Sequence, residues 1–302
     1  MKNKKIKKYL VIGGAGFIGS HLSDRLLNLK NQVTILDNLS TGKKKNINPK
    51  AKFFKADIRN LKQILPYFKN IDGVFLLAAL PQVEYSINYP RESNENNLNG
   101  TLNVLVASQQ AKVKKIVYSS SSAIYGNTKK TPIKEIFKSN PLSPYALQKL
   151  AGEEYCRLFS LIHNLETVSL RYFNVYGTRM NNKGAYINVI SIFINQLTKK
   201  QPLTITGNGK QTRDFVHIND VVEANILAMN SKKTKQGEVI NIGSGKSYSI
   251  NKIANMFSSK IKYITRRLEP YKTLADISLA KKLLNWEPKV KLKQGIKEII
   301  KY

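Results

Sequence analysis

The residues best suited to proton transfer are a tyrosine and a lysine four positions apart, Tyr145 and Lys149. Side chains with this spacing lie on one face of a helix, so the phenol and the ammonium can act together. A phenol has a pKa near ~10 in water, which is too high for a base at neutral pH. We expect the lysine cation to stabilise the phenolate and to lower this pKa. Such a pair also fits an ordinary helix, so its significance depends on the residues around it.

A run of four serines, 119–122, precedes this pair and directly follows the apolar run 115–118. We expect the apolar run to form a buried strand that ends at the serines. A serine hydroxyl at such a strand end can bind the same substrate oxygen as the phenol. The helix that carries the pair is expected to open at Pro144, after a loop rich in Pro, Ser, Asn and Lys. The stretch from Ser119 to Lys149 is therefore the candidate catalytic segment.

A glycine-rich turn near the N-terminus indicates a cofactor site. Strand 9–12 leads directly into the sequence GGAGFIG at 13–19, and apolar residues then recur with helical spacing. Glycines in such a turn let the backbone approach a pyrophosphate, which binds at the N-terminus of the helix. The next strand, 32–36, ends at Asp37, about 20 residues further on, where an acid binds the adenosine ribose hydroxyls. Because Asp37 would repel a 2′-phosphate, the sequence favours NAD over NADP.

Strands and helices alternate through the first half of the chain. Further strands are expected at 52–56, 73–79 and 116–118, with a helix at 102–110 between the last two. This alternation predicts an α/β fold with a doubly wound parallel sheet. Ligands bind such sheets at the carboxyl ends of the strands, where the serines and Tyr145 would lie. In the second half the alternation becomes irregular, and we expect most substrate contacts to come from there.

Composition limits the classes of protein to which the chain can belong. With 302 residues and 42% hydrophobic content, it can bury a real core in one large or two ordinary domains. No apolar run approaches the ~20 residues of a membrane helix, and we expect a cytoplasmic protein. A single cysteine, Cys156, excludes a disulfide framework and is expected to be a core thiol. The three histidines, His21, His163 and His217, match no metal-binding spacing, so no metal is expected.

The charge is strongly positive. The sequence has 50 Lys and Arg residues against 19 Asp and Glu residues, which gives a net charge of +31. Such an excess can indicate binding to nucleic acid or to another anionic surface. Here the lysines are scattered along the whole chain, and no aromatic-plus-basic RNA-binding motif is present. We therefore attribute the charge to solvated faces, although a positive field would also attract a nucleotide diphosphate.

Four motifs together resemble one enzyme family. They are the glycine turn 13–19, the segment 37–42 (DNLSTG), the set Ser121/Tyr145/Lys149 and the segment 171–177 (RYFNVYG). In these motifs, and nearly from end to end, the chain is similar to extended short-chain dehydrogenases/reductases of the NAD-dependent sugar-nucleotide epimerase/dehydratase family.

The resemblance implies how the chain is organised. It implies a Rossmann domain over 1–175, with its sheet completed by parts of 214–245. A smaller α/β domain over 176–302 would bind the nucleotide sugar. A homodimer is also implied, built on the helix 103–111 and on the helix that begins at Tyr145.

The resemblance also assigns roles to individual residues. Catalysis is expected from Ser121, Tyr145 and Lys149. NAD is expected to contact Gly13, Gly16, Phe17, Ile18, Gly19, Asp37, Asn38, Ser40, Thr41, Gly42, Asp57, Ile58, Leu77, Ala78, Ala79, Asn97, Ser119, Tyr145, Lys149 and Tyr172. The UDP-sugar is expected to contact Val83, Ser121, Ser122, Tyr145, Asn174, Asn188, Val189, Thr204, Thr206, Arg213, Arg266, Glu269 and Thr273.

The substrate residues divide between the two ends of the UDP-sugar. Arg213 and Arg266 are expected to bind the diphosphate, a role that suits a permanently charged, forked donor. Glu269 is expected to bind the uridine ribose. The segment 266–269 departs from the family's usual Arg-Pro-Gly-Asp, which leaves Arg267 as an alternative to Arg266.

The residue two positions before Tyr125 distinguishes members of this family by their reaction. Dehydratases and decarboxylases carry an acidic residue there, which moves a proton on a keto-sugar intermediate, whereas this chain has Ala123. Without that acid, hydride transfer remains but elimination lacks its catalyst. The resemblance therefore implies a 4-epimerase. In it, Tyr145 takes the proton of the sugar 4-hydroxyl as hydride passes to NAD, and hydride then returns to the other face of the keto sugar.

Two positions bear on the identity of the sugar. UDP-glucuronate epimerases tend to carry Thr at the position of Asn174, which disfavours a uronate. Thr273, at the family's gate position, is small and would admit a 2-acetamido group. We therefore expect UDP-GlcNAc/UDP-GalNAc, UDP-glucose/UDP-galactose or both as substrates. The alternatives are a UDP-glucuronate 4-epimerase, a nucleotide-sugar 4,6-dehydratase and, as a non-enzyme, a basic RNA-binding relative.

Overall fold

The fold is built on a seven-stranded sheet in which every neighbouring pair of strands is parallel. The computed structural model describes residues 6–128, 130–180, 188–257, 260–265 and 270–301. The strand order is β10-β6-β5-β4-β1-β2-β3, which reverses between β1 and β4 and confirms the predicted doubly wound α/β sheet. The strands are β1 (Lys8–Ile12), β2 (Gln32–Asp37), β3 (Lys52–Lys55), β4 (Gly73–Leu76), β5 (Lys115–Ser121), β6 (Glu166–Tyr172) and β10 (Gln236–Ile242).

Helices cover both faces of this sheet because its strands are apolar on both sides. Along β1, Tyr9 and Val11 belong to one buried cluster, whereas Leu10 and Ile12 belong to the other. This alternation is the period of two that a strand imposes on its side chains. The first cluster is closed by α1 (Phe17–Asn28), α8 (Ile218–Asn230) and α10 (Ser278–Leu284). The second is closed by α2 (Leu61–Ile64), α5 (Gly100–Gln110) and α6 (Pro144–His163).

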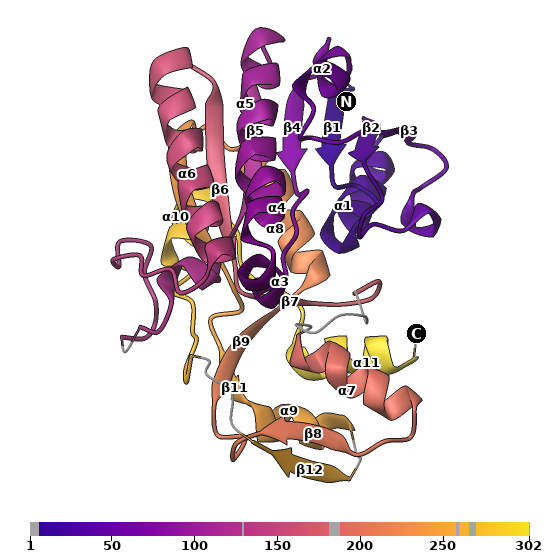
Figure 1. Cartoon of the computed structure of the whole chain (residues 1–302), viewed down its shortest axis with the longest axis vertical. Coiled ribbons are helices and arrows are strands. Elements are labelled where there is room, and N and C mark those ends of the chain that lie inside the picture. The colour runs from indigo at the N-terminus through magenta and orange to yellow at the C-terminus, as the bar shows by residue number, and fades with distance from the viewer. Residues whose placement is uncertain (1–5, 129, 181–187, 258–259, 266–269, 302) are drawn as a thin grey trace.

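A smaller lobe lies beyond the carboxyl ends of the large sheet, with its own apolar cluster (Figure 1). One of its sheets has three strands, β7 (Asn174–Tyr176), β9 (Thr212–His217) and β11 (Ser247–Ser249). The other has two strands, β8 (Leu203–Thr206) and β12 (Ile261–Ile264). Its helices are α7 (Val189–Thr198), α9 (Ile250–Ala254) and α11 (Leu292–Lys301). Because α8, β10 and α10 return to the large sheet, the chain passes between the two lobes several times.

Two expectations from composition can be compared with the fold. Among the residues that the structure describes, no helix has both the length and the apolar character needed to span a bilayer. Cys156 is buried in the cluster beneath α6, as expected of a core thiol. Burial raises the pKa of this thiol to about 12, so the reactive thiolate is strongly disfavoured.

A buried lysine ties the start of β5 to the connection between α8 and β10. Lys115 is 3% exposed, and its Nζ donates to the Ser231 carbonyl at 2.8 Å and to Thr234 Oγ1 at 2.9 Å. Burial lowers the pKa of Lys115 to about 8. The folded protein therefore loses this proton at a lower pH than the unfolded chain does.

Replacing Lys115 by Met should flatten the pH dependence of stability between about pH 8 and about pH 9.5. In this interval the unfolded chain keeps a proton that the folded protein has lost, so the free energy of unfolding rises with pH. One full proton contributes at most ~1.4 kcal/mol per pH unit. Urea unfolding at a series of pH values measures the slope. The control is Lys114→Met, at the exposed neighbouring lysine, which should keep the wild-type slope. Identical slopes in the wild type and both variants would contradict the lowered pKa of Lys115.

Candidate active site

A cavity opens at the carboxyl ends of β1, β2, β4 and β5, where the strand order reverses. Parallel sheets bind their ligands at this position. Most of the predicted cofactor residues line it: Gly13, Gly16, Phe17, Ile18, Gly19, Asp37, Asn38, Ser40, Thr41, Ile58, Leu77, Ala78, Ala79, Ser119, Tyr145, Lys149 and Tyr172. Other residues that line the cavity were not predicted, among them Leu80, Pro81 and Asn96.

The glycine turn provides room for a phosphate at the start of α1. Gly13 has φ +84°, and a Cβ there would lie 2.6 Å from the backbone nitrogen of Ala78. A Cβ on Gly19 would overlap the Gly13 carbonyl oxygen, so these two glycines hold the turn against β4 and α1. Gly16 differs, because its Cβ position meets only that carbonyl oxygen, at 3.2 Å, and it caps α1 without a side-chain hydrogen bond. The helix N-terminus is thus left open to an anion, as a dinucleotide pyrophosphate requires.

Asp37 ends β2 with its carboxylate held by the backbone. Its Oδ2 accepts from the Ala15 N–H at 3.0 Å and its Oδ1 from the Leu39 N–H at 2.8 Å. Burial raises the pKa of Asp37, while these two hydrogen bonds act in the opposite direction. Each oxygen keeps a further lone pair for a ribose hydroxyl, whereas a 2′-phosphate would meet negative charge. Predicted Gly42 does not line the cavity; a Cβ there would lie 2.9 Å from Asp37 Oδ1, so Gly42 packs against this carboxylate.

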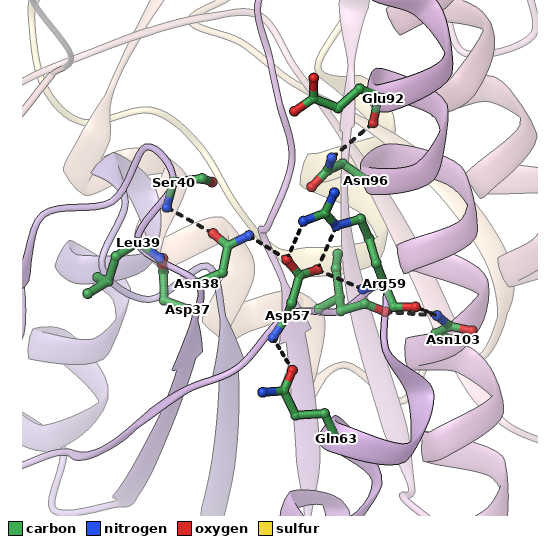
Figure 2. A network of polar contacts seen from close by, with 11 residues as sticks. Asp37, Asn38, Leu39, Ser40, Asp57, Arg59, Gln63, Glu92, Asn96 and Asn103 are labelled. Carbon is green, nitrogen blue, oxygen red and sulfur yellow. Dashed lines mark hydrogen bonds and ion pairs between the residues drawn. The ribbon is translucent and has the colours of Figure 1, made fainter.

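Figure 2 shows the polar network at the same end of the cavity. Asn38 donates from Nδ2 to Asp57 Oδ2 at 3.0 Å and accepts from the Ser40 N–H at 2.9 Å. Arg59 donates from Nε to Asp57 Oδ1 at 3.0 Å and from Nη2 to Asp57 Oδ2 at 2.8 Å. Hydrogen bonding from Arg59 lowers the pKa of Asp57 to about 2. Asp57 was expected to contact the cofactor, but it lies behind Asn38 and orients that side chain, which does line the cavity.

Asn97 was likewise expected at the cavity, but the structure places its neighbour Asn96 there. The two asparagines lie in a π-helical turn, η3 (Glu95–Asn99), which offsets them from ordinary helical spacing. Asn97 accepts from the Leu80 N–H at 2.8 Å and donates to the Leu80 carbonyl at 3.1 Å. It also donates to Gln148 Oε1 of α6 at 2.8 Å. Asn97 therefore fixes the cavity wall at Leu80 against the helix that carries the Tyr/Lys pair.

Tyr145 and Lys149 project from the first turns of α6 into the cavity. Ser143 caps this helix by accepting from the Ala146 N–H, and Pro144 occupies the first turn, as the sequence predicts. The Tyr145 N–H donates to Ser86 Oγ at 3.1 Å, in helix α3 (Val83–Asn88). Lys149 Nζ donates to the Ser119 carbonyl at 2.7 Å and lies 6.0 Å from the centre of the Tyr145 ring.

The electrostatics of the pair differ from the sequence-based expectation. Burial raises the pKa of Tyr145, and a hydrogen bond with the predicted partner Ser121 only partly opposes this. The expected lowering by Lys149 does not dominate, because the phenol is shielded from water that would solvate its anion. Burial also lowers the pKa of Lys149 to about 8. Burial by itself therefore disfavours the phenolate of Tyr145.

The predicted substrate residues of the second half gather around β9, outside the residues that line this cavity. Asn174 Nδ2 donates to the Asp214 carbonyl at 2.9 Å, and the Thr273 N–H donates to the Thr212 carbonyl at 3.1 Å. Arg213 lies between these contacts on β9. Asn188 caps α7 and donates to the Val175 carbonyl at 3.0 Å, with Val189 as the first residue of the helix.

Other predicted substrate residues are placed as follows. Thr204 and Thr206 lie on β8, where Gln196 and Gln211 donate to their hydroxyls. Val83 begins α3 after β4, Ser121 ends β5 and Ser122 directly follows it, and none of the three lines the cavity. Arg266, Glu269 and the alternative Arg267 lie outside the described residues.

A buried carboxylate that the sequence analysis missed organises this region. Asp214 Oδ1 accepts from the Ser244 N–H at 2.6 Å and from its hydroxyl at 2.7 Å. Asp214 Oδ2 accepts from the N–H groups of Gly245 and Ala275, at 3.1 and 3.0 Å. Burial raises the pKa of Asp214, and these bonds counter that shift. Asp214 thus joins β9 to the loop after β10 and to the segment before α10, and it lies next to Arg213 on β9. The only sequence signal was its place beside that arginine.

Together, the open glycine turn, the acid at the end of β2 and the Tyr/Lys pair define a dinucleotide-dependent enzyme of the Rossmann type. The family model for the NAD dependent epimerase/dehydratase family matches residues 9–243. The chain belongs to this family, as its sequence motifs indicated, and NAD is its cofactor.

Three similar proteins illustrate the family. A putative UDP-glucose 4-epimerase of Methanocaldococcus jannaschii is 42% identical, over 97% of both chains. The structure of UDP-glucose 4-epimerase from Thermotoga maritima with UDP-glucose has a TM-score of 0.94 and 36% identity, covering 98% of both chains. UDP-N-acetylglucosamine 4-epimerase from Methanobrevibacter ruminantium, in complex with UDP-N-acetylmuramic acid, has the same TM-score and identity and covers 99% of this chain and 98% of its own.

Gly16→Ala should weaken NAD binding by at least about 10-fold while leaving the fold intact. The backbone at Gly16, with φ −77°, suits alanine, but the new methyl group would point into the space left for the phosphates. Gly19→Ala is the matched comparison and should also lower Tm, because its methyl group meets backbone. NAD titration followed by fluorescence, with Tm measured without added NAD, separates the two effects. Unchanged NAD affinity in Gly16→Ala would contradict this placement of the pyrophosphate.

Proposed function

We propose that this protein is a UDP-hexose 4-epimerase that inverts the configuration of the sugar 4-hydroxyl. The observation that carries the proposal is that Tyr145 and Lys149 line one cavity together and that Ser121 hydrogen-bonds with Tyr145. The likeness to epimerases over nearly the whole chain supports it. A positively charged chain also suits a substrate with a diphosphate.

Each residue of this set has a distinct task. Tyr145 accepts the proton of the sugar 4-hydroxyl and later returns it. Lys149, whose ammonium faces the phenol ring, favours the phenolate during that transfer. Ser121, through its hydrogen bond with Tyr145, orients the phenol and binds the same sugar oxygen. NAD supplies the hydride chemistry, since it accepts a hydride from the sugar and gives it back without net oxidation.

The environment of Ala123 supports epimerisation over dehydration. Ala123 lies in the single helical turn η4 (Ser122–Tyr125), directly after β5, and its N–H donates to Ser121 Oγ at 3.1 Å. A carboxylate at this position would stand next to the catalytic serine, where it could move a proton during elimination. The alanine methyl group cannot transfer a proton, so the keto sugar can only take the hydride back.

Purified protein should interconvert UDP-GlcNAc and UDP-GalNAc, UDP-glucose and UDP-galactose, or both pairs, without added NAD. Thr273 supports the wider range, because a small side chain at this position leaves space for an acetamido group. NMR of each reaction separates these products from UDP-galacturonate and from 4-keto-6-deoxy sugars. Turnover of UDP-glucuronate alone, or a 4-keto-6-deoxy product, would refute the proposal.

Tyr145→Phe should lower kcat by about 10²–10⁴-fold and retain bound NAD. The substitution removes only the phenol hydroxyl, so the packing of α6 is kept. Tyr85→Phe is the control, because this tyrosine lies on α3 outside the cavity lining. Comparable losses of activity in the two variants would remove Tyr145 from its catalytic role.

We further propose that the protein is a cytoplasmic homodimer. Leu147, Leu158, Leu161 and Ile162 are exposed on α6, with exposed fractions of 57%, 36%, 72% and 64%. Their spacing places them along one side of the helix, which packs beside α5 (Figure 1). An apolar row of this length favours a second copy of the chain as its cover. The free thiol of Cys156 and the NAD chemistry suit a reducing cytoplasm.

Leu161→Lys should convert the dimer into a monomer, because two lysines would meet across a two-fold interface. Light scattering coupled to gel filtration gives the mass. Ile300→Lys, at a partly exposed position on α11 of the smaller lobe, should leave the dimer intact. A wild-type protein that elutes as a monomer at micromolar concentration would rule out the dimer.

A further inference from the structure

A buried ion pair joins the helix that carries Tyr145 and Lys149 to strand β6. Glu153 of α6 is 2% exposed and Arg171 of β6 is 5% exposed. Arg171 Nε donates to Glu153 Oε1 at 2.9 Å, and Nη2 donates to Oε2 at 2.7 Å. Burial alone would lower the pKa of Arg171, but its pairing with Glu153 raises it. Such pairs rarely add stability relative to apolar residues of similar size, so this one calls for another explanation.

The pair joins the catalytic helix to the strand that carries the serines. Lys149 and Glu153 are one helical turn apart, so they face β5 together. Lys149 Nζ binds the Ser119 carbonyl, and the next residue, Ser120, donates from its hydroxyl to Glu153 Oε1. Ser120 pairs in register with Arg171 across the β5–β6 ladder. One carboxylate therefore fixes α6, β5 and β6 at the level of the reacting groups.

Arg171 extends the connection to the loop that leads into α6. Its guanidinium carbon lies 4.7 Å from the centre of the Tyr125 ring, and Nη1 donates to the Glu135 carbonyl at 3.4 Å. Asn241 of β10 closes the network by accepting from the Tyr125 hydroxyl at 2.7 Å and donating its N–H to Glu135 Oε1 at 2.8 Å. The loop before Tyr145 is thus anchored to the same pair.

The groups that face Lys149 are few. From α6 they are Tyr145, Glu153 and Cys156, and from β5 the Tyr118 ring, whose centre lies 4.9 Å from Lys149 Nζ. Burial lowers the pKa of Lys149 to about 8, and Cys156 and Glu153 act in the opposite direction. Cys156 itself stays protonated, because burial raises the pKa of its thiol to about 12. Glu153 is then the carboxylate that favours the charged form of Lys149.

We propose that Glu153 and Arg171, together with Ser120, are positioning residues that hold Lys149 and the end of β5 for proton transfer at Tyr145. This inference rests on the proposed function, because the proton transfer belongs to the epimerase reaction. Arg171 neutralises Glu153 and fixes its carboxylate, and Glu153 in turn supports the ammonium of Lys149. None of the three residues needs to touch the sugar.

Glu153→Gln tests the proposal through the pH dependence of kcat. We expect kcat to fall about 10- to 100-fold with KM nearly unchanged, because the reacting groups lose their alignment. The alkaline limb should also move to lower pH, by about 0.5–1 unit, because Lys149 loses a nearby carboxylate. A purely structural role would not move this limb. Glu154→Gln is the matched control, since Glu154 is the exposed next residue and forms a surface ion pair with Arg157, at 3.0 Å.

A double variant, Glu153→Leu with Arg171→Met, keeps the proposal testable if an unpaired Arg171 prevents folding of Glu153→Gln. Removing both charges should keep Tm within about 5 °C of the wild type and give the same fall in kcat. The alkaline limb should move in the same direction but by less, because the Arg171 cation is removed as well. Ser120→Ala should give a smaller change in the same direction. Wild-type kcat and an unshifted limb in a folded Glu153→Gln or double variant would overturn the proposal.

The proposed function is tested separately by turnover of the wild type in the same assay. If the wild type converts none of the UDP-sugars, the variants are compared by the NAD that they retain through gel filtration at about pH 9, since Lys149 lines the NAD cavity. Lower retention in Glu153→Gln than in Glu154→Gln would support the positioning role. Equal retention in the two variants would overturn it, whatever the substrate is.

Discussion

The in-register pairing of four parallel strands is the constraint on which the rest of the structure depends. Ile12 of β1 pairs with Leu76 of β4. Leu76 pairs in turn with Tyr118 of β5, which pairs with Ser169 of β6. Because of this register, the four strands end side by side. One edge of the sheet therefore collects the glycine turn, the small residues after β4, the serines and Tyr172. A slip of one residue in any pair would turn the following side chains to the opposite face.

This alignment brings charged groups into a region that is largely closed to water, and each is held by a specific partner. Asp37 is held by two backbone N–H groups, Lys149 by the Ser119 carbonyl, and Arg171 by Glu153. Leaving any of them unpaired would be costly, so the same bonds that shape the site also protect the fold. Each charged group therefore has a fixed hydrogen-bond partner, which positions it more accurately than water would.

The sequence predicted those parts of the site that depend on local chain geometry. The glycine turn, the acid after β2 and the Tyr/Lys spacing each follow from a strand–turn–helix pattern, and the structure places them around one cavity. Asn96 rather than the predicted Asn97 lines the cavity. The two residues lie in a π-helical turn, which no sequence pattern predicts. The pKa shifts of Tyr145 and Lys149 depend on burial by distant segments. Likewise, nothing local to Asp214 predicts the two segments, at Ser244–Gly245 and at Ala275, whose N–H groups it binds.

The repeated passage of the chain between the two lobes has a consequence for how such an enzyme can change. The small lobe begins at β7, yet α8 and β10 return to the large sheet between its strands β9 and β11, and α10 returns after β12. No single pair of cuts in the gene would therefore separate the smaller lobe from the large sheet. Recombination that exchanged the smaller lobe would also remove α8, β10 and α10 from the large sheet. New sugar preferences must then arise by point substitutions and by changes in loop length, with the cofactor half inherited unchanged.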